Sequence, residues 1–322
     1  WLFSITTTVT GLFLAVFAVR FAAQGLWGVC AQVSMARYFH ADRGKAAAVS
    51  TAGYALGFAI FPLIGAWLLM TFGWREAWAF SAWFVILVIL PLTMFQLWGH
   101  GKRHLAYSER LAGFVDEKTG TKVRQWALKG VLSDARFWLL QPAMLAVPAI
   151  IFSIQFHQLY LIESRGWALT AFAGGYTVYS VVSLLAILIT GSMIDRYGSY
   201  KLVILYLCPL VPALLVLAFV SSAISIPIFM ALTGVTFGMS LVVFMTVWAE
   251  MYGTKNMGAI RSFNIFLNVS FASLVMVLTG WLIDGGVSIE VMCLGGVGVV
   301  ALSLISTTVA RRMPEPHRAS VS

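Results

Sequence analysis

Long runs of apolar residues decide what this chain can fold into. A helix that crosses a bilayer needs roughly 20 mostly apolar residues, and nine such runs follow one another. They lie near residues 12–36, 46–72, 76–98, 136–161, 168–192, 201–220, 225–249, 260–283 and 288–310, after a short apolar stub at 1–8. Only 10% of the residues are charged, whereas soluble domains carry about a quarter. We therefore expect an all-α polytopic membrane protein.

The positions of the basic residues predict how the spans are oriented. Of the 21 Lys and Arg residues, all except Arg20, Arg75 and Arg165 flank or connect the spans on one side. Basic residues collect on the cytoplasmic side of membrane proteins, so this side and the C-terminus are predicted to be cytoplasmic. The net charge of +9 then reflects this distribution, and we expect the lipid bilayer as a partner and no nucleic acid.

A weak internal repeat predicts two halves. Residues 38–44, from Tyr38 to Gly44, resemble residues 252–258 at an offset of 214, and each copy connects two spans. Extending this offset backwards from residue 136 implies a parent of twelve helices. Because the chain opens with Trp1 inside an apolar stretch, we expect helices one, two and most of three to be missing. The expected domains are an N-terminal bundle remnant at 1–98, a cytoplasmic linker at 99–135, and a six-helix bundle with its tail at 136–322.

One loop carries a motif of a known family. The chain reads Gly191-Ser-Met-Ile-Asp195-Arg196-Tyr-Gly198-Ser-Tyr-Lys201 after the span that ends near 192. This stretch resembles the Gly-x-x-x-Asp-Arg-x-Gly loop of the major facilitator superfamily. Further similarities cover nearly the whole chain: Arg20 with Gln24-Gly25, Arg43-Gly44-Lys45 before Gly53-x-x-x-Gly57, and residues 248–262. The last stretch resembles the bacterial branch that includes monocarboxylate and oxalate/formate carriers.

This resemblance implies the major facilitator fold, in which two helical bundles move a solute by alternating access. It also implies a bacterial inner (cell) membrane. The sequence departs from the patterns of known family members at two places, and these bear on the expected kind of transport. Phe61 precedes Pro62 where antiporters carry Gly, so symport is favoured over exchange. The span at 168–192 lacks the intramembrane Asp and Arg of animal monocarboxylate carriers.

Arg20 is the first candidate for solute binding, because it is the basic residue that we place inside a span. A charge at this depth is costly unless it is paired or hydrated. Gln24 follows one turn later on the same face. Arg20 would meet an anionic solute; alternatively it forms a structural ion pair or extends towards the membrane surface.

His157 heads a second candidate group, together with Ser153, Gln158 and Tyr179. Histidine titrates near neutral pH, which suits proton coupling or hydrogen bonding to a solute. The alternative is an interfacial histidine with a purely structural role. Tyr176 is a further possible cavity residue, whereas Asn264 and Asn268 are expected to make helix–helix hydrogen bonds. We expect Gly234 and Gly238 to allow close packing.

A third set of residues is assigned to gating and loop structure: Gly191, Asp195, Arg196, Gly198, Arg43, Gly44 and Arg261. By the repeat, Asp195 should lie within a few ångströms of the start of the helix near Arg43 to Ala46. The dipole of that helix would favour the negative charge.

The sequence thus predicts a secondary active transporter for a small solute such as an organic carboxylate, acting as a monomer and coupled to protons or another ion. No nucleophile, metal-ligand or cofactor motif is apparent, so we expect neither an enzyme nor a bound metal or cofactor. Cys30, Cys208 and Cys293 are expected to be buried packing residues. Three alternatives stay open: a receptor or scaffold on the same fold, a drug or metabolite exporter, and an inactive fragment. The end of the linker, residues 124–132, is expected either to tether the halves or to lie on the membrane surface.

Overall fold

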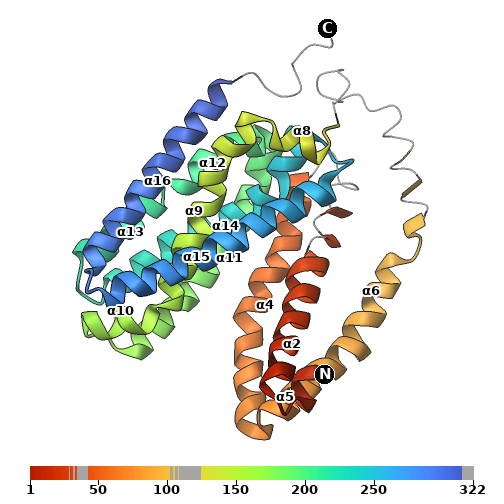
Figure 1. Cartoon of the computed structure of the whole chain (residues 1–322), viewed down its shortest axis with the longest axis horizontal. Helices are drawn as coiled ribbons and strands as arrows, with labels where there is room; N and C mark the ends of the chain where they lie inside the picture. The colour runs from red at the N-terminus through yellow and green to blue at the C-terminus, as the bar shows by residue number, and fades with distance from the viewer. Residues whose placement is uncertain are drawn as a thin grey trace. The chain divides into compact units, whose positions relative to one another are not determined.

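The computed structural model describes residues 1–28, 30–31, 33–34, 43–101, 104–105, 108 and 125–313. Side chains are described at these residues except at 24–25, 43–44, 54–55, 58–59, 62–63, 66, 169 and 173. The described residues form helices joined by turns, and none of them lies in a strand (Figure 1). The chain divides into two compact units: unit 1 comprises residues 1–38 and 56–123, and unit 2 comprises residues 39–55 and 124–322.

Unit 1 contains short helical segments that follow one another closely. They are α1 (Leu2–Ile5), α2 (Val9–Arg20), the π-helix η1 (Phe21–Trp27), α5 (Trp74–Phe84), the π-helix η2 (Val85–Ile89) and α6 (Leu90–Leu97). Thr8 begins α2, since its hydroxyl accepts a hydrogen bond from the Gly11 amide at 3.1 Å. The stretch Trp74–Leu97 is apolar and long enough to cross a membrane.

The long helix α4 (Arg43–Phe72) belongs partly to each unit. Its 30 residues give a length of ~45 Å, which exceeds the hydrocarbon thickness of a bilayer. Residues 43–55 at its start cluster with unit 2, and the remainder clusters with unit 1. The division expected at 99–135 stays a prediction.

Unit 2 contains the C-terminal helices. They are α8 (Leu128–Leu132), α9 (Ala135–Phe156), α10 (Gln158–Arg165), α11 (Leu169–Tyr197), α12 (Ser199–Leu207), α13 (Leu210–Phe219), α14 (Ser225–Tyr252), α15 (Met257–Asp284) and α16 (Ile289–Arg312). Six apolar stretches of this unit are long enough to span a membrane, with α12 and α13 counted as one. With Trp74–Leu97, the described part of the chain holds seven candidate spans. The prediction of an all-α polytopic membrane protein is confirmed.

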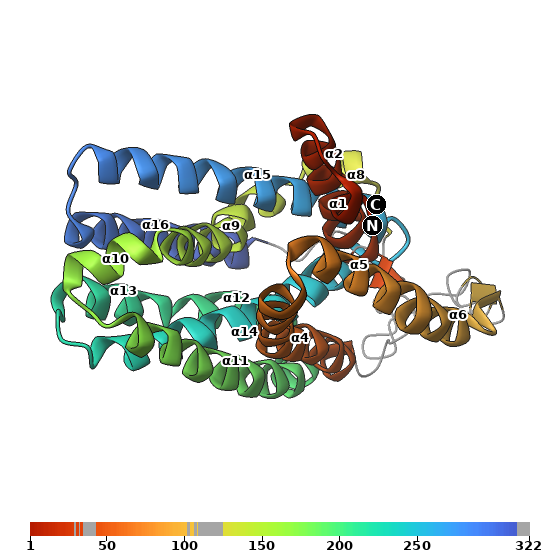
Figure 2. The same cartoon turned by 90° about the horizontal axis from the view of Figure 1, so that it is seen from below.

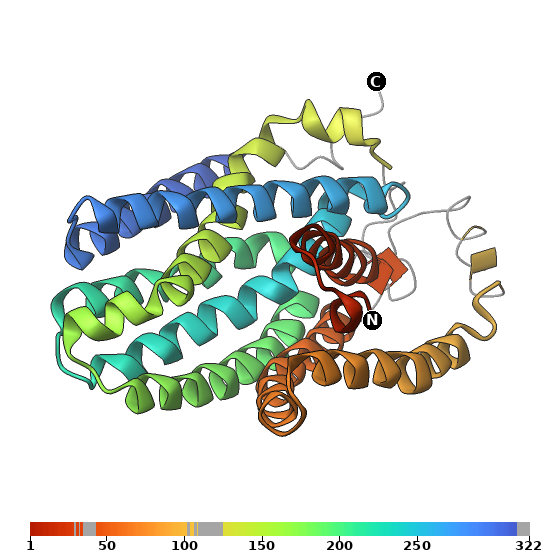
Figure 3. The same cartoon turned by 60° about the horizontal axis from the view of Figure 1, so that its bottom comes forward.

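The helices of unit 2 pack in two groups. In Figure 2, α9, α15 and α16 form one group, and α11, α14, α12 and α13 form the other. Within the second group α14 runs beside α11 over most of its length (Figure 3). Glycines bring these two helices together, since a Cβ on Gly234 would lie 2.8 Å from the Tyr179 carbonyl oxygen. Small residues allow such close contact between membrane helices, so the expected role of Gly234 is confirmed.

Three local expectations need correction: a single helix at 136–161, the burial of Cys30 and the burial of Cys208. The apolar run at 136–161 is not one helix, because α9 ends at Phe156 and α10 starts after His157, whose backbone angles (φ −95°, ψ 21°) break the helix. Cys30 and Cys208 are exposed at the surface of the described chain, and only Cys293 is buried. An apolar thiol is compatible with a surface that meets lipid.

The end of the linker is docked on unit 2. Val131 of α8 is fully buried, and the Trp126 amide donates to the Tyr252 carbonyl oxygen at 3.1 Å. The Asn256 side chain donates to the Trp126 carbonyl oxygen at 2.9 Å. Trp126 and Val131 thus face protein. These contacts argue against a helix lying on the membrane surface, and the role of a tether between the halves stays a prediction.

Candidate functional site

His157 lies at the break between α9 and α10, and the break determines its contacts. Its Nδ1 lies 3.0 Å from the Ser153 carbonyl oxygen. A carbonyl oxygen only accepts hydrogen bonds, so Nδ1 is the protonated nitrogen in this arrangement. The Nε2 atom then faces α15, where it lies 3.4 Å from the position of a Cβ on Gly280. Gly280 therefore leaves room for the imidazole ring between the helices.

Ser153 connects the same region of α9 to α15. Its hydroxyl donates to the Thr279 hydroxyl at 2.7 Å, and the Thr279 hydroxyl donates to the Val275 carbonyl oxygen at 2.8 Å. Both serine and histidine are thus held by hydrogen bonds within unit 2. Thr279 was missed in the sequence, although its position beside Gly280 in an apolar helix was a usable signal.

Gln158 connects α10 to α11. Its Oε1 accepts a hydrogen bond from the Tyr176 hydroxyl at 2.7 Å. The Tyr176 ring contacts the Tyr179 ring with centroids 6.3 Å apart. The structure therefore brings together Ser153, His157 and Gln158, and it joins Tyr179 to them through Tyr176. We call the first three residues the outer polar group, because the predicted orientation places them towards the outer side of the membrane.

Arg20 lies in unit 1 at a change of helical type. It is the last residue of α2, and the next seven residues wind as the π-helix η1. Short π segments occur frequently at functional sites, and the Arg20 side chain is exposed within its unit. The Gln24 side chain lies outside the described residues, and the binding of a solute by Arg20 stays a prediction.

Asp195 lies where the sequence placed it. Its Oδ2 accepts a hydrogen bond from the Lys45 amide at 3.1 Å, at the start of α4. This amide belongs to the first turn of the helix, where backbone donors lack intrahelical partners. The expected contact between Asp195 and this helix end is confirmed, whereas its role in gating stays a prediction. The side chain of Arg43 lies outside the described residues, and Gly44 lies in the first turn of α4.

The neighbouring motif residues shape the same turn. Gly198 ends α11 with φ +84°, a conformation that glycine adopts readily. The Arg196 guanidinium lies 5.3 Å from the centre of the Tyr197 ring. Gly191 is buried within α11.

Glu250 is a functional candidate that the sequence did not reveal. Its Oε2 accepts a hydrogen bond from the Ser199 amide at 2.7 Å, and the Ser199 hydroxyl donates to the same oxygen. Glu250 thereby caps the N-terminus of α12 from the end of α14. The sequence signal was present, because Glu250 lies within the quoted 248–262 stretch and Ser199 follows Gly198. Only the fold brings the two together.

Arg261 lies inside unit 2 rather than on a loop. The residue is 3% exposed in the second turn of α15. One turn further, the Asn264 side chain donates to Gln141 Oε1 of α9 at 3.3 Å, and the Asn268 side chain donates to the Asn264 carbonyl oxygen at 3.0 Å. The helix–helix role expected of Asn264 is confirmed, while Asn268 bonds within its own helix.

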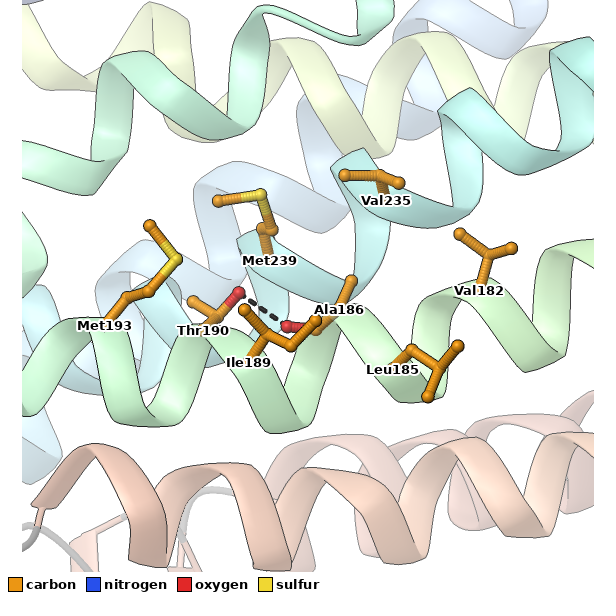
Figure 4. Close-up of a pocket in the computed structure, with 8 residues that line it drawn as sticks. All are labelled: Val182, Leu185, Ala186, Ile189, Thr190, Met193, Val235 and Met239. Atoms are coloured by element: carbon orange, nitrogen blue, oxygen red, sulfur yellow. Dashed lines mark hydrogen bonds between the residues drawn. The ribbon is translucent and has the colours of Figure 1, made fainter.

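An apolar groove of about 240 Å³ lies between α11 and α14 (Figure 4). It is lined by Val182, Leu185, Ala186, Ile189, Thr190, Met193, Val235 and Met239. The Thr190 hydroxyl donates to the Ala186 carbonyl oxygen at 2.6 Å, as the dashed line shows. Since its hydroxyl is engaged within its own helix, the groove offers a polar solute little to bind, and we do not place the solute there.

The described residues hold no cluster of three or more His, Cys, Asp or Glu side chains that would suit a metal ion.

Comparison with known proteins agrees with this architecture. A search of curated proteins found no match. A family model described as Major Facilitator Superfamily matches residues 1–272 of the 322-residue chain. The match, the apolar helices and the loop at Gly191–Lys201 agree, and the chain belongs to the Major Facilitator Superfamily, a family of membrane transporters.

Proposed function

We propose that this protein is a secondary active transporter that moves a small organic anion, such as a carboxylate, by alternating access. Arg20 is the observation that carries the anion proposal. The sequence predicts it within an apolar span, and in the structure it ends α2 and lies directly before a π-helical segment. A guanidinium binds a carboxylate through paired hydrogen bonds, so an arginine at membrane depth suits a carboxylate solute.

The outer polar group supports the remaining part of the proposal. His157, Ser153 and Gln158 present neutral donors and acceptors, which suit hydrogen bonds to a solute. His157 is also a candidate for proton coupling, because imidazole exchanges protons in the physiological pH range. The proposed mechanism is therefore symport of the anion with a proton across the cytoplasmic membrane. In the proposed topology the C-terminus lies in the cytoplasm.

Uptake into proteoliposomes tests this proposal. The reconstituted protein is given labelled carboxylates with and without an inward proton gradient, alongside Arg20→Gln and His157→Ala. We expect gradient-stimulated uptake of at least one carboxylate. Loss of a charged hydrogen bond should lower uptake by about tenfold to a hundredfold in Arg20→Gln, whereas His157→Ala should remove the dependence on the gradient.

Two controls make the result specific. Arg312→Gln removes the same charge at the exposed cytoplasmic end of α16, and His104→Ala removes an exposed imidazole beyond α6; both should transport normally. If a neutral or cationic drug moved while every carboxylate failed, the anion proposal would be wrong and export of drugs or metabolites would replace it.

A further inference from the structure

Charged residues are confined to the helix ends of unit 2. The stretches 137–162, 166–194, 202–249, 262–283 and 291–310 contain no Asp, Glu, Lys or Arg, and they form the bodies of its six spans. His157 is the one histidine among them. The middle of each span of this unit therefore offers only neutral hydrogen-bonding groups and apolar surface.

Four rings form a continuous row across three helices of this neutral half. The Phe152 ring of α9 contacts the Phe237 ring of α14 with centroids 6.0 Å apart. The Phe237 ring contacts the Tyr179 ring of α11 at 5.8 Å, and Tyr179 contacts Tyr176 at 6.3 Å. We call these four residues the aromatic row. Phe152, Phe237 and Tyr176 are half-buried, whereas Tyr179 is buried.

The backbone holds this row in place. Because Gly234 lets α11 approach α14 closely at Tyr179, the rings of the two helices meet. The aromatic row also adjoins the outer polar group at both ends. Phe152 immediately precedes Ser153 in α9, and the Tyr176 hydroxyl donates to Gln158 at 2.7 Å.

We propose that the aromatic row is a subsite for a flat ring on the transported solute, and that the solute carries a single negative charge. This inference rests on the proposed function. Aromatic side chains favour offset or edge-on contact with another ring, and two of the three contacts within the row are edge-on. A second charge would have to be dehydrated against a wall that has no opposite charge, which is unfavourable. The preferred solutes are therefore aromatic monocarboxylates, and dicarboxylates are disfavoured.

Competition with matched probes tests the subsite. The probes are benzoate, which has a ring and one charge; hexanoate, which has one charge and no ring; terephthalate, which has a ring and two charges; and acetate. Each probe is added unlabelled, and inhibition of the uptake of a labelled carboxylate into proteoliposomes is measured. We expect benzoate to inhibit this uptake most strongly and terephthalate to inhibit it weakly. In Phe237→Leu the half-inhibitory concentration of benzoate should rise by about fivefold to tenfold, while that of acetate should change less than about twofold. Phe237→Tyr should recover most of the loss.

Phe219→Leu is the matched control, because Phe219 is 67% exposed at the end of α13 and lies outside the aromatic row. Thermal unfolding of each variant identifies any that fails to fold, and Phe152→Leu then provides a second variant of the row. If Phe237→Leu and Phe152→Leu affect acetate as much as benzoate, or if terephthalate competes as well as benzoate, the subsite is wrong. Binding of carboxylates without ring preference overturns the subsite and leaves the proposed function standing. If benzamide binds in a Phe237-dependent way while no carboxylate does, the single negative charge and the proposed anion function fail, and only the ring-binding role of the row stands.

Discussion

At the scale of single residues, Gly234 shows how one position sets the spacing of two helices. A methyl group there would lie 2.8 Å from the Tyr179 carbonyl oxygen and 3.4 Å from the Ser183 hydroxyl oxygen. The first of these neighbours is backbone, which does not move aside without shifting α11. The Ser183 hydroxyl also donates to the Gly234 carbonyl oxygen at 3.0 Å, so the same contact holds a hydrogen bond between helices.

We predict that Gly234→Ala destabilises the protein by about 1–3 kcal/mol, the range for overpacking a close contact. Gly298→Ala in α16 is the control, because a methyl group there meets nothing within 4 Å. Alanine favours a helix over glycine by about 1 kcal/mol, so this control should be neutral or stabilising. Thermal unfolding in detergent measures both. Equal melting temperatures for the two variants would show that the helices tolerate greater separation.

At the scale of elements, hydropathy predicted the spans of unit 2 to within a few residues, because each span needs a long apolar stretch. The same signal missed the break at His157, since residues 158–162 continue the apolar run while the backbone turns. It also missed the π-helix η1, whose residues 21–27 contain no proline. The cap of α12 by Glu250 was not predicted for a different reason. Its two partners are 51 residues apart, and only the packing of α14 beside α12 brings them together.

The docked end of the linker gives a prediction at this scale. The Asn256 side chain donates to the Trp126 carbonyl oxygen, and the Lys255 amide donates to Gln125 Oε1 at 3.0 Å. These bonds join the linker to the turn between α14 and α15. We predict that Asn256→Ala loosens α8 locally, by about 1 kcal/mol, while the remaining helices stay folded.

Limited trypsin digestion measures this loosening, because Lys129 is exposed within α8. Cleavage after Lys129 requires local opening of the helix, so Asn256→Ala should accelerate it by about fivefold. Ser306→Ala, in α16 and away from the linker, is the control and should digest at the parent rate. An unchanged rate at Lys129 in Asn256→Ala would mean that the hydrogen bond to Trp126 does not hold α8.

At the scale of the whole molecule, contacts at both ends tie the helices of unit 2 together. At one end the Arg165 guanidinium donates to Glu290 of α16 at 2.9 Å and to the Leu217 carbonyl oxygen of α13 at 3.0 Å. At the other end Glu250 joins α14 to α12, and Asn264 joins α15 to α9. These links favour motion of unit 2 as one body. The contact between Asp195 and Lys45 also lies within unit 2, and it holds the start of α4, a helix whose remainder clusters with unit 1.

Alternating access requires a contact that forms in one state and breaks in another, and we predict that the bond from Lys45 to Asp195 is such a contact. Asp195→Asn keeps the size of the side chain and removes the charge that the start of α4 favours. The state that contains the contact should lose population by about fivefold to tenfold. Spin labels at Val49→Cys and Lys201→Cys, in a background without the native cysteines, report the distance between α4 and α12. We expect the short-distance population to fall in Asp195→Asn and to remain in Asp284→Asn, which removes an exposed acid at the end of α15. If both variants keep the parent distances while transport by Asp195→Asn stays normal, the contact is a static support for α4 and the gate lies elsewhere.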